Sequence, residues 1–507
     1  MRTPVNTRTK SLVSGLLVTM SLGALNQTIL ATALPTVVGD LNGVDRMTWV
    51  ISSYILASTI MMPIYGKISD LVGRRPMLLI AIAVFLVGAV VCATAGSITW
   101  LVVGRAVQGI GGGGLLVLSQ AAIADVVPAR DRGRYMGAIN SVYAVASIAG
   151  PLLGGWLTEG PGWRWAFWLS IPLGMVAATA CILFLNVPHE SVIERPQLDF
   201  AGMSLIGAWT TVIVLIGTWG GSTYAWTSVQ ILGLSIAALI LALVVALIEL
   251  KASEPILPSA LFRDRNFNLV TTAGLLIGIV MFGTVGYMPT YLQMGQGISA
   301  TNAGLLMISM MGGLLTTSVI SGQIVARTGR YKIFPVIGTL VMGTGLALIS
   351  TVTGDLPLAV VCTYLAVFGT GIGMTTQILT LIVQNSFPTR VVGTATAGTN
   401  YFRQVGATLG SAVVGSLFAA RLTTHIQEDA AEAGGVNSLT PDTVTQLPDE
   451  LRDNVITSYS NALLPIFLWM VPLVAIAMVL LCFVFEKPLS TGVEDDDLDP
   501  DSVASVA

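Results

Sequence analysis

The chain alternates long apolar runs with short polar connections along almost its whole length. Most apolar runs reach about 20 residues, the length that a helix needs to cross a bilayer. The connections carry most of the charged residues and contain Gly and Pro, which end helices. An even number of spans places both chain ends on one side of the membrane. The pattern predicts fourteen membrane-spanning helices, near residues 12–38, 48–68, 76–96, 100–124, 134–157, 165–186, 200–220, 228–249, 268–293, 303–325, 332–352, 356–381, 393–419 and 459–484.

Composition points the same way. Of the 507 residues, 54% are hydrophobic and only 10% are charged, against roughly 25% charged in soluble domains. This excludes a disordered chain, a disulfide scaffold and an ordinary soluble enzyme. The predicted fold is an all-α membrane protein whose backbone polar groups are satisfied within helices.

The chain carries no recognisable enzyme chemistry. Four Cys lie in apolar runs and two His stand alone, so neither a metal site nor a cofactor is expected. The run Gly109–Gly114 matches a dinucleotide fingerprint formally, but no strand precedes it and it lies within a span. There is no phosphate-binding loop for ATP and no sign of nucleic-acid binding. We therefore expect a protein that is not an enzyme.

The distribution of basic residues predicts the orientation. With the N-terminus assigned to the cytoplasm, eighteen Lys and Arg residues outside the spans face inward and four face outward. This bias is the positive-inside pattern of membrane proteins. We expect a multi-pass protein of the plasma (inner) membrane with both termini cytoplasmic.

The sequence contains an internal repeat. Residues 66–74 recur at 322–330, an offset of 256, and Pro128 and Gly133 recur as Pro388 and Gly393, an offset of 260. Two similar offsets in the same order predict two related six-span halves, whose interface near the bilayer midplane holds the substrate site. The predicted divisions are an N-terminal half over 1–199, two inserted helices over 200–249, a C-terminal half over 250–485 with an outer loop over 421–458, and an acidic cytoplasmic tail over 486–507.

Several short motifs in the right order carry a family resemblance. They lie at 25–35, 66–75, 105–109, 150–155, 163–167, 291–293 and 402–406. On these motifs the chain resembles the major facilitator superfamily, in its fourteen-span drug:proton antiporter branch. The resemblance covers nearly the whole sequence. It implies a membrane exporter that works by alternating access.

The resemblance implies a cytoplasmic latch between the halves. Its residues would be Gly66, Asp70, Gly73, Arg74, Arg75 and Asp125. An acid at this place can also meet a helix N-terminus in the other half. The alternative is ordinary anchoring by inside-positive charge. Since Ala326 and Asn385 replace the two acids in the second half, the latch is expected in the N-terminal half alone.

A second motif is expected to shape span five. Gly150, Pro151, Gly154 and Gly155 would break and thin the helix, because proline frees a carbonyl and small residues let helices approach closely. The resemblance implies that this kink seals the transport cavity against leak. Plain close packing is the simpler explanation, and the two are compatible.

Arg105 lies within a span, with Gln108 on the same helix face. An arginine there costs roughly 2.5–3.5 kcal/mol on insertion scales. It is therefore expected to face a cavity or a partner, although an arginine reaching toward the outer interface is an alternative. For Arg403 a cavity position and a cytoplasmic anchor remain equally open.

The family's proton-carrying aspartate in span one is missing, because Asn26 occupies its position. Three interpretations stay open. Asn26 is an engineered neutral replacement, or acids at span ends such as Asp70 or Asp125 carry the proton, or the protein is weakly coupled or uses another ion.

The sequence therefore predicts an exporter of amphipathic small molecules, with protons and membrane lipid as further partners and a monomeric state. A dedicated exporter of a lipid, siderophore or metabolite and a non-transporting membrane sensor are the alternatives. Adaptable aromatic, methionine and amide side chains suit such a cavity. The expected cavity residues are Asn26, Tyr54, Met61, Arg105, Gln108, Tyr291, Gln293, Arg403 and Gln404.

Overall fold

A computed structural model describes residues 7–41, 46–185, 199–221, 223–252, 254–296, 298, 300–352, 356–426 and 449–489. The acidic run 494–497, most of the expected outer loop (427–448) and the boundary segment 186–198 lie outside the described residues. Within the described part the regular structure is helical, apart from one isolated bridge between Gly220 and Tyr224. The predicted all-helical class is confirmed.

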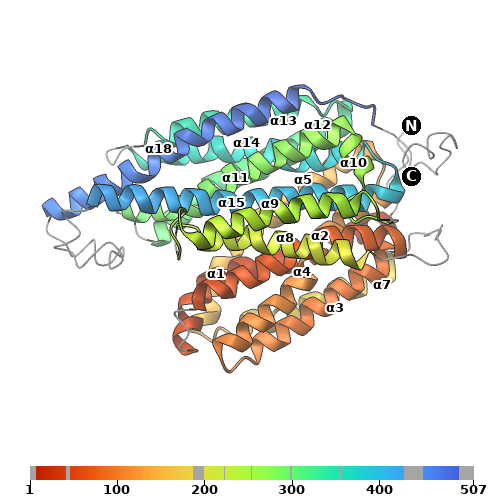
Figure 1. Ribbon diagram of the computed structural model, residues 1–507, viewed down its shortest axis with the longest axis horizontal. Coiled ribbons are helices and arrows are strands. Elements are labelled where there is room, and N and C mark those ends of the chain that lie inside the picture. The colour runs from red at the N-terminus through yellow and green to blue at the C-terminus, as the bar shows by residue number, and fades with distance from the viewer. Residues whose placement is uncertain are drawn as a thin grey trace.

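The first six spans form an N-terminal half (Figure 1). The sixth span consists of two consecutive short helices, α6 and α7. Ser97 caps α4 by accepting a hydrogen bond from the Trp100 N–H. The helices are α1 (Thr7–Asp40), α2 (Met47–Val72), α3 (Arg74–Ala93), α4 (Ile98–Val126), α5 (Ala129–Glu159), α6 (Trp165–Trp168) and α7 (Ser170–Phe184).

Two inserted helices follow, α8 (Phe200–Trp219) and α9 (Val229–Glu249). Asp199 and Ser228 cap them by accepting hydrogen bonds from backbone N–H groups of the first turns. Figure 1 shows the pair in front of the junction between the two halves. α8 packs on both α2 and α15, whereas α9 packs mainly on α8.

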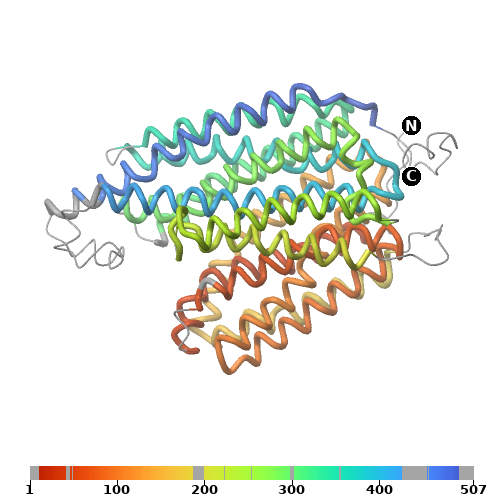
Figure 2. The backbone as a smooth tube through the Cα atoms, viewed as in Figure 1, coloured from red at the N-terminus to blue at the C-terminus, as the bar shows by residue number. Residues whose placement is uncertain are grey.

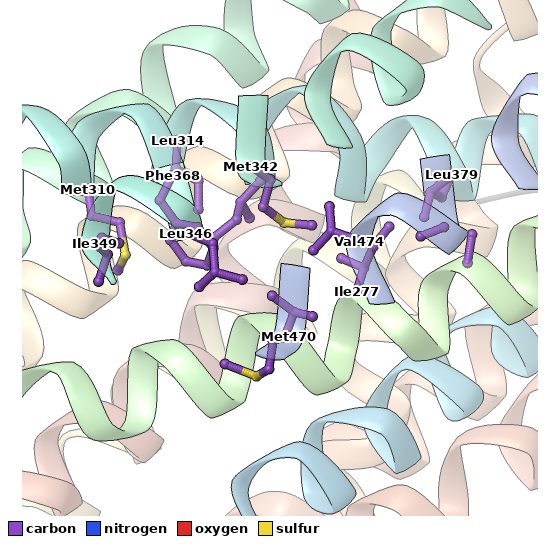
Figure 3. Close-up of a cluster of buried hydrophobic side chains, with 14 of the residues drawn as sticks. Ile277, Met310, Leu314, Met342, Leu346, Ile349, Phe368, Leu379, Met470 and Val474 are labelled. Carbon is purple, nitrogen blue, oxygen red and sulfur yellow. The ribbon is translucent and has the colours of Figure 1, made fainter. Parts of the chain in front are cut away.

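The C-terminal half repeats the six-span arrangement, and the backbone trace in Figure 2 shows it above the first half. Its core joins residues of α11 to α14 and α18, including Ile277, Met310, Leu346, Phe368 and Val474 (Figure 3). The elements are α10 (Ser259–Arg263), α11 (Arg265–Met294), α12 (Ala300–Thr328), α13 (Ile333–Ile349), α14 (Leu358–Gln384), η2 (Thr389–Val391), α15 (Val392–Ile426) and α18 (Asp449–Cys482).

The fourteen predicted spans correspond to these helices one by one. Thirteen of the described spans are long and apolar enough to cross a membrane. The other, α13, has 17 residues, the lower limit for a bilayer of about 30 Å. Several helices begin or end beyond the apolar runs, because a run marks only the part inside hydrocarbon. α15 and α18 thus shorten the expected loop 421–458, and Arg421 joins them by donating to the carbonyls of Asn461 and Ala462.

The alternation of the spans gives the bundle two ends. One end is where α2, α4 and α14 finish and where α5 and α15 begin. We call this end of the bundle the latch end. Basic residues of the connections gather at this end, among them Arg75, Arg130, Arg263 and Arg330, whereas Arg46 and Arg164 lie at the other. In Figure 1 the N-terminal half runs obliquely away from the C-terminal half toward the end opposite the latch end.

Candidate functional site

The Arg105 side chain is at the centre of a buried polar cluster in the N-terminal half. It is 2% exposed. One guanidinium nitrogen donates to Asn26 Oδ1 and to Gln108 Oε1, both at 2.6 Å, and Nε donates to the Val50 carbonyl at 3.3 Å. The Tyr54 ring lies 4.2 Å below the guanidinium carbon, within the range of a cation–π interaction. Four expected site residues are thus brought together.

This cluster holds a positive charge without a carboxylate. Among the described residues no acid forms an ion pair with Arg105. Carbonyl oxygens and an aromatic face instead supply partial negative charge. The Nε2 of Gln108 is buried and has no hydrogen-bond partner within the described residues. The arginine therefore lies with partners inside the span and does not reach toward an interface.

Glycines of α4 make room for the cluster. A Cβ at Gly112 would lie 2.3 Å from the Tyr54 hydroxyl, and one at Gly109 would lie 2.5 Å from the Tyr54 carbonyl. Since real Cβ atoms do not approach so closely, these positions need glycine. The Gly109–Gly114 run thus serves helix packing.

A second group, the latch, is formed by Asp70, Arg74 and Asp125 at the latch end. Arg74 forms ion pairs with Asp70 and with Asp125, whose Oδ2 lies 2.9 Å from Nε. Their side chains are 4–6% exposed. Gly73 permits the sharp turn between α2 and α3, because its φ is 101°. Arg75 does not belong to this group. It is half-buried and donates to the Ile182 carbonyl of α7 at 2.9 Å.

The latch reaches across to the other half. Asp70 accepts hydrogen bonds from the N–H groups of Gly393, at 3.1 Å, and Thr394, at 2.6 Å, and from the Thr394 hydroxyl, at 2.5 Å. These residues form the first turn of α15, where N–H groups have no partner within the helix. The carboxylate therefore binds the positive end of the α15 dipole.

The repeat is realised as a crossed contact. Gly66 approaches Gly393 so closely that a Cβ on Gly66 would lie 2.9 Å from the Gly393 carbonyl. The corresponding residues Gly322 and Gly133 are also in contact, with a Cβ on Gly322 2.2 Å from the Gly133 carbonyl. Each half thus gives one member of each pair.

At this second contact Ala326 occupies the position that Asp70 occupies at the first. Arg130 of α5 donates instead to the carbonyls of Ala326 and Arg327 at the end of α12. Arg132 donates to the carbonyl of Gln384 at the end of α14. The sequence analysis counts both only among the inward-facing basic residues. In fact cations meet the negative ends of helices in the opposite half.

A layer of buried amides lies deeper between the halves, and we call it the amide seam. Gln377 donates to Asn140 at 2.8 Å, and Asn400 donates to Gln120 at 2.7 Å. Gln384 donates to the Gln120 carbonyl at 3.2 Å. Sequence reasoning missed this layer. The signal was available, because amides within apolar spans are costly unless they are paired.

The motif of α5 packs against α1. A Cβ at Gly150 would lie 2.0 Å from Thr28 Oγ1, and one at Gly154 would lie 2.8 Å from the Ile29 carbonyl, whereas nothing lies within 4 Å of one at Gly155. α5 continues without interruption through Pro151. The prediction of a broken helix is therefore wrong, because the helix accommodates the proline while the glycines provide the close approach.

The remaining expected cavity residues are not gathered with Arg105. Tyr291 is fully buried in the core of the C-terminal half, where its hydroxyl donates to the Val352 carbonyl. Gln293 donates to the Pro289 carbonyl of its own helix, and Met61 packs at the edge of the core of the N-terminal half.

The last two, Arg403 and Gln404, lie well inside α15. Arg403 donates to Asn400 Oδ1 at 2.6 Å, which links it to the amide seam. The Gln404 carbonyl accepts a hydrogen bond from Thr408.

Comparison with known proteins decides the family. The sequence profile of the Major Facilitator Superfamily matches residues 16–411. The chain belongs to the major facilitator superfamily. The predicted family is thereby confirmed, and the chain is a multi-pass membrane transporter.

The curated relatives cover nearly the whole chain. An uncharacterised MFS-type transporter of Mycobacterium tuberculosis, Rv1877, is 38% identical over 96% of this chain and 70% of its own length. Two Bacillus subtilis proteins, multidrug transporter protein MdtP and multidrug resistance protein 3, are 32% and 30% identical over 97% and 96% of this chain, and over 96% and 97% of their own lengths. They support the fourteen-span multidrug branch.

Solved structures show the same major facilitator fold. The human organic anion transporter MFSD10 (TETRAN) superimposes with a TM-score of 0.63 at 15% identity over 92% of this chain and all of its own. The proton:xylose symporter XylE, bound to 6-bromo-6-deoxy-D-glucose, gives 0.59 at 16% identity over 96% of this chain and 99% of its own.

Proposed function

We propose that this transporter exports amphipathic small molecules by alternating access, with the latch end in the cytoplasm. The observation that carries the proposal is the placement of the hydrogen bonds between the two halves. The latch, the Arg130 contacts and the amide seam all lie toward one end of the bundle. Two halves that are held together toward one end can separate at the other end. Rocking of the halves about the midplane then exposes the substrate site to one side of the membrane and afterwards to the other.

The orientation rests on charge. The basic residues of the connections gather at the latch end, and such residues stay on the cytoplasmic side. This supports a plasma-membrane protein whose two termini are cytoplasmic. The proposed halves are those of the repeat, 1–199 and 250–485, with the inserted helices over 200–249 between them.

Two features support an amphipathic substrate. Relatives at 30–32% identity over nearly the whole chain are named multidrug transporters. The centre of the N-terminal half offers an arginine, amides and an aromatic ring within an apolar span. Such a mixture suits molecules that have both an apolar body and a polar group.

The experiment is transport by the purified chain in liposomes. A neutral amphipathic dye and a pH gradient of either sign are applied, with protein-free liposomes as the control. We expect dye movement that needs the protein, and its response to the gradient reports whether protons are coupled to export. If the protein moves no solute under any gradient, the proposal is contradicted and a sensor is favoured.

A further inference from the structure

The two lateral seams between the halves are covered differently. On one side α2 meets α15, and α8 lies over that seam. The Thr210 hydroxyl lies 2.6 Å from the Tyr401 hydroxyl. Cβ atoms at Gly207 and Gly217 would lie 3.5 Å from Ile60 and 3.1 Å from Thr408. One inserted helix therefore contacts both halves and shields this seam from lipid.

On the other side α5 meets α12, and no described helix lies over this seam. A groove of about 470 Å³ runs along it between α1, α5 and α12. It lies on the lipid-facing side of α5, since Val145 is 57% exposed and Leu152, further along that face, is 71% exposed. The groove therefore opens to the bilayer and not to the interior of the protein.

The groove is apolar along its length and charged near one end. Leu17, Val142, Val145 and Val319 line it, and Arg134 and Gln323 give it a polar end. Arg134 and Gln323 lie near the latch end, because α5 begins at Ala129 and α12 finishes at Thr328. The chemistry thus changes from cationic near the membrane surface to apolar within it.

Arg134 is exposed, and its guanidinium has no hydrogen bond or ion pair to any described residue. The covered seam differs in this respect. There Lys67, which corresponds to Gln323 in the repeat, forms an ion pair with Glu254 at 2.6 Å. The positive charge of Arg134, at the seam between α5 and α12, is therefore available to an external anion.

The length of the groove matches one leaflet. From Arg134 to Val145 the helix rises about 16 Å at 1.5 Å per residue. Half of a hydrocarbon core of about 30 Å is about 15 Å. An acyl chain of one leaflet can thus lie along the apolar part while its headgroup stays at Arg134.

We propose that the groove binds an anionic phospholipid from the leaflet at the latch end. The phosphate would meet the Arg134 guanidinium and the Gln323 amide, and one acyl chain would lie along α5. Membrane-surface arginines attract anionic lipids in this way. The inference needs only the membrane location and is independent of the transported substrate.

The site joins the two halves. Arg134 and Val145 belong to the N-terminal half, whereas Val319 and Gln323 belong to the C-terminal half. Rocking that opens the latch end would separate α5 from α12 and divide the groove. A ligand that binds only the undivided groove shifts the population toward the state closed at the latch end.

The test is lipid retention. The purified chain is placed in nanodiscs of equal phosphatidylglycerol and phosphatidylcholine, and lipids that stay bound are counted by native mass spectrometry. We expect phosphatidylglycerol to be enriched, and Arg134→Gln to reduce the enrichment about fivefold. Arg330→Gln is the matched control, because it removes an exposed arginine of the latch end outside the groove.

A second variant tests the apolar part. Val145→Trp fills the groove without changing charge, so retention of both lipids should fall. Double electron–electron resonance between labels on α5 and α12 should show that phosphatidylglycerol favours the short distance. Equal retention of the two lipids by the parent chain, or an equal loss in Arg134→Gln and Arg330→Gln, would overturn the proposal.

Discussion

The carboxylate of Asp70, near the end of α2, accepts hydrogen bonds from both the backbone N–H and the hydroxyl of Thr394, in the first turn of α15. This contact joins the two halves through the N-terminus of a helix. The corresponding N–H groups of the other seam, those of Gly133 and Arg134, lie further inside their helix, because α5 already begins at Ala129. They are used within α5, so the two seams cannot be closed by the same chemistry.

Asp70→Asn should shift the protein toward the state open at the latch end. The amide cannot accept the same set of hydrogen bonds or balance Arg74. Ala326→Asp should have a much smaller effect, because the N–H groups of Gly133 and Arg134, which correspond to those that Asp70 binds, are used within α5. Double electron–electron resonance distances across the latch end measure both variants. Equal shifts for the two changes would show that the latch is not one-sided.

Gly150→Ala should destabilise the protein by about 2 kcal/mol, because the new methyl group would overlap Thr28 of α1. Gly155→Ala is the matched control on the same helix, since nothing lies within 4 Å of its Cβ position. We expect a change of no more than about 0.5 kcal/mol for the control. Denaturant unfolding in detergent measures both. Similar losses in the two variants would contradict this packing role, because helix propensity alone favours alanine over glycine.

Arg105→Leu should lower the free energy of unfolding by about 3 kcal/mol. The substitution leaves the oxygens of Asn26, Gln108 and Val50 buried without their donor. Arg105→Lys keeps the charge and should lower the free energy of unfolding by less. It should still lower it, because an ammonium group cannot reproduce the planar arrangement of N–H donors in a guanidinium. The same unfolding assay applies. A fully stable Arg105→Leu protein would contradict the role of Arg105 as the centre of this cluster.

Substrate binding should change little between about pH 5.5 and 8, because no histidine or carboxylate lies in the Arg105 cluster. Asn26→Asp places a titratable group 2.6 Å from the guanidinium and should make binding depend on pH. Fluorescence titration of a neutral amphiphile at several pH values measures this. A steep pH dependence in the unsubstituted chain would point to a proton carrier elsewhere.

A monovalent lipophilic cation should bind more weakly than its neutral analogue. A like charge about 6 Å from Arg105 costs roughly 3 kcal/mol at an effective dielectric constant of about 20, a factor of about a hundred in affinity. Asn26→Asp should recover cation binding by neutralising the arginine. Tryptophan quenching with the matched pair of ligands measures the ratio. An unchanged ratio in the variant would exclude this electrostatic cause.

Sequence patterns predicted the fold well, because the bilayer leaves few solutions for an apolar segment of this length. The family motifs contain Asn26, Arg105 and Gln108, which lie in contact in the structure. Helix ends were predicted less well. The charged residues Arg130 and Arg132 continue α5, although they lie outside the apolar run.

The contacts between halves were the hardest part to predict. Gln120 and Asn400 are 280 residues apart and meet only after both halves have folded. Nothing in the local sequence around either amide names its partner. For Tyr291 a family motif suggested a position in the cavity. In the structure its ring is instead buried in the core of the C-terminal half.

The crossed glycine contacts have the form of an isologous interface, in which residue i of one copy meets residue j of the other and j meets i. Gly66 with Gly393 and Gly322 with Gly133 satisfy this relation within one chain. Each half therefore carries both complementary surfaces of a self-associating unit. A substitution at one of the two glycine contacts therefore has a corresponding substitution at the other. The two variants can be compared within the same protein to measure how much each contact between the halves contributes.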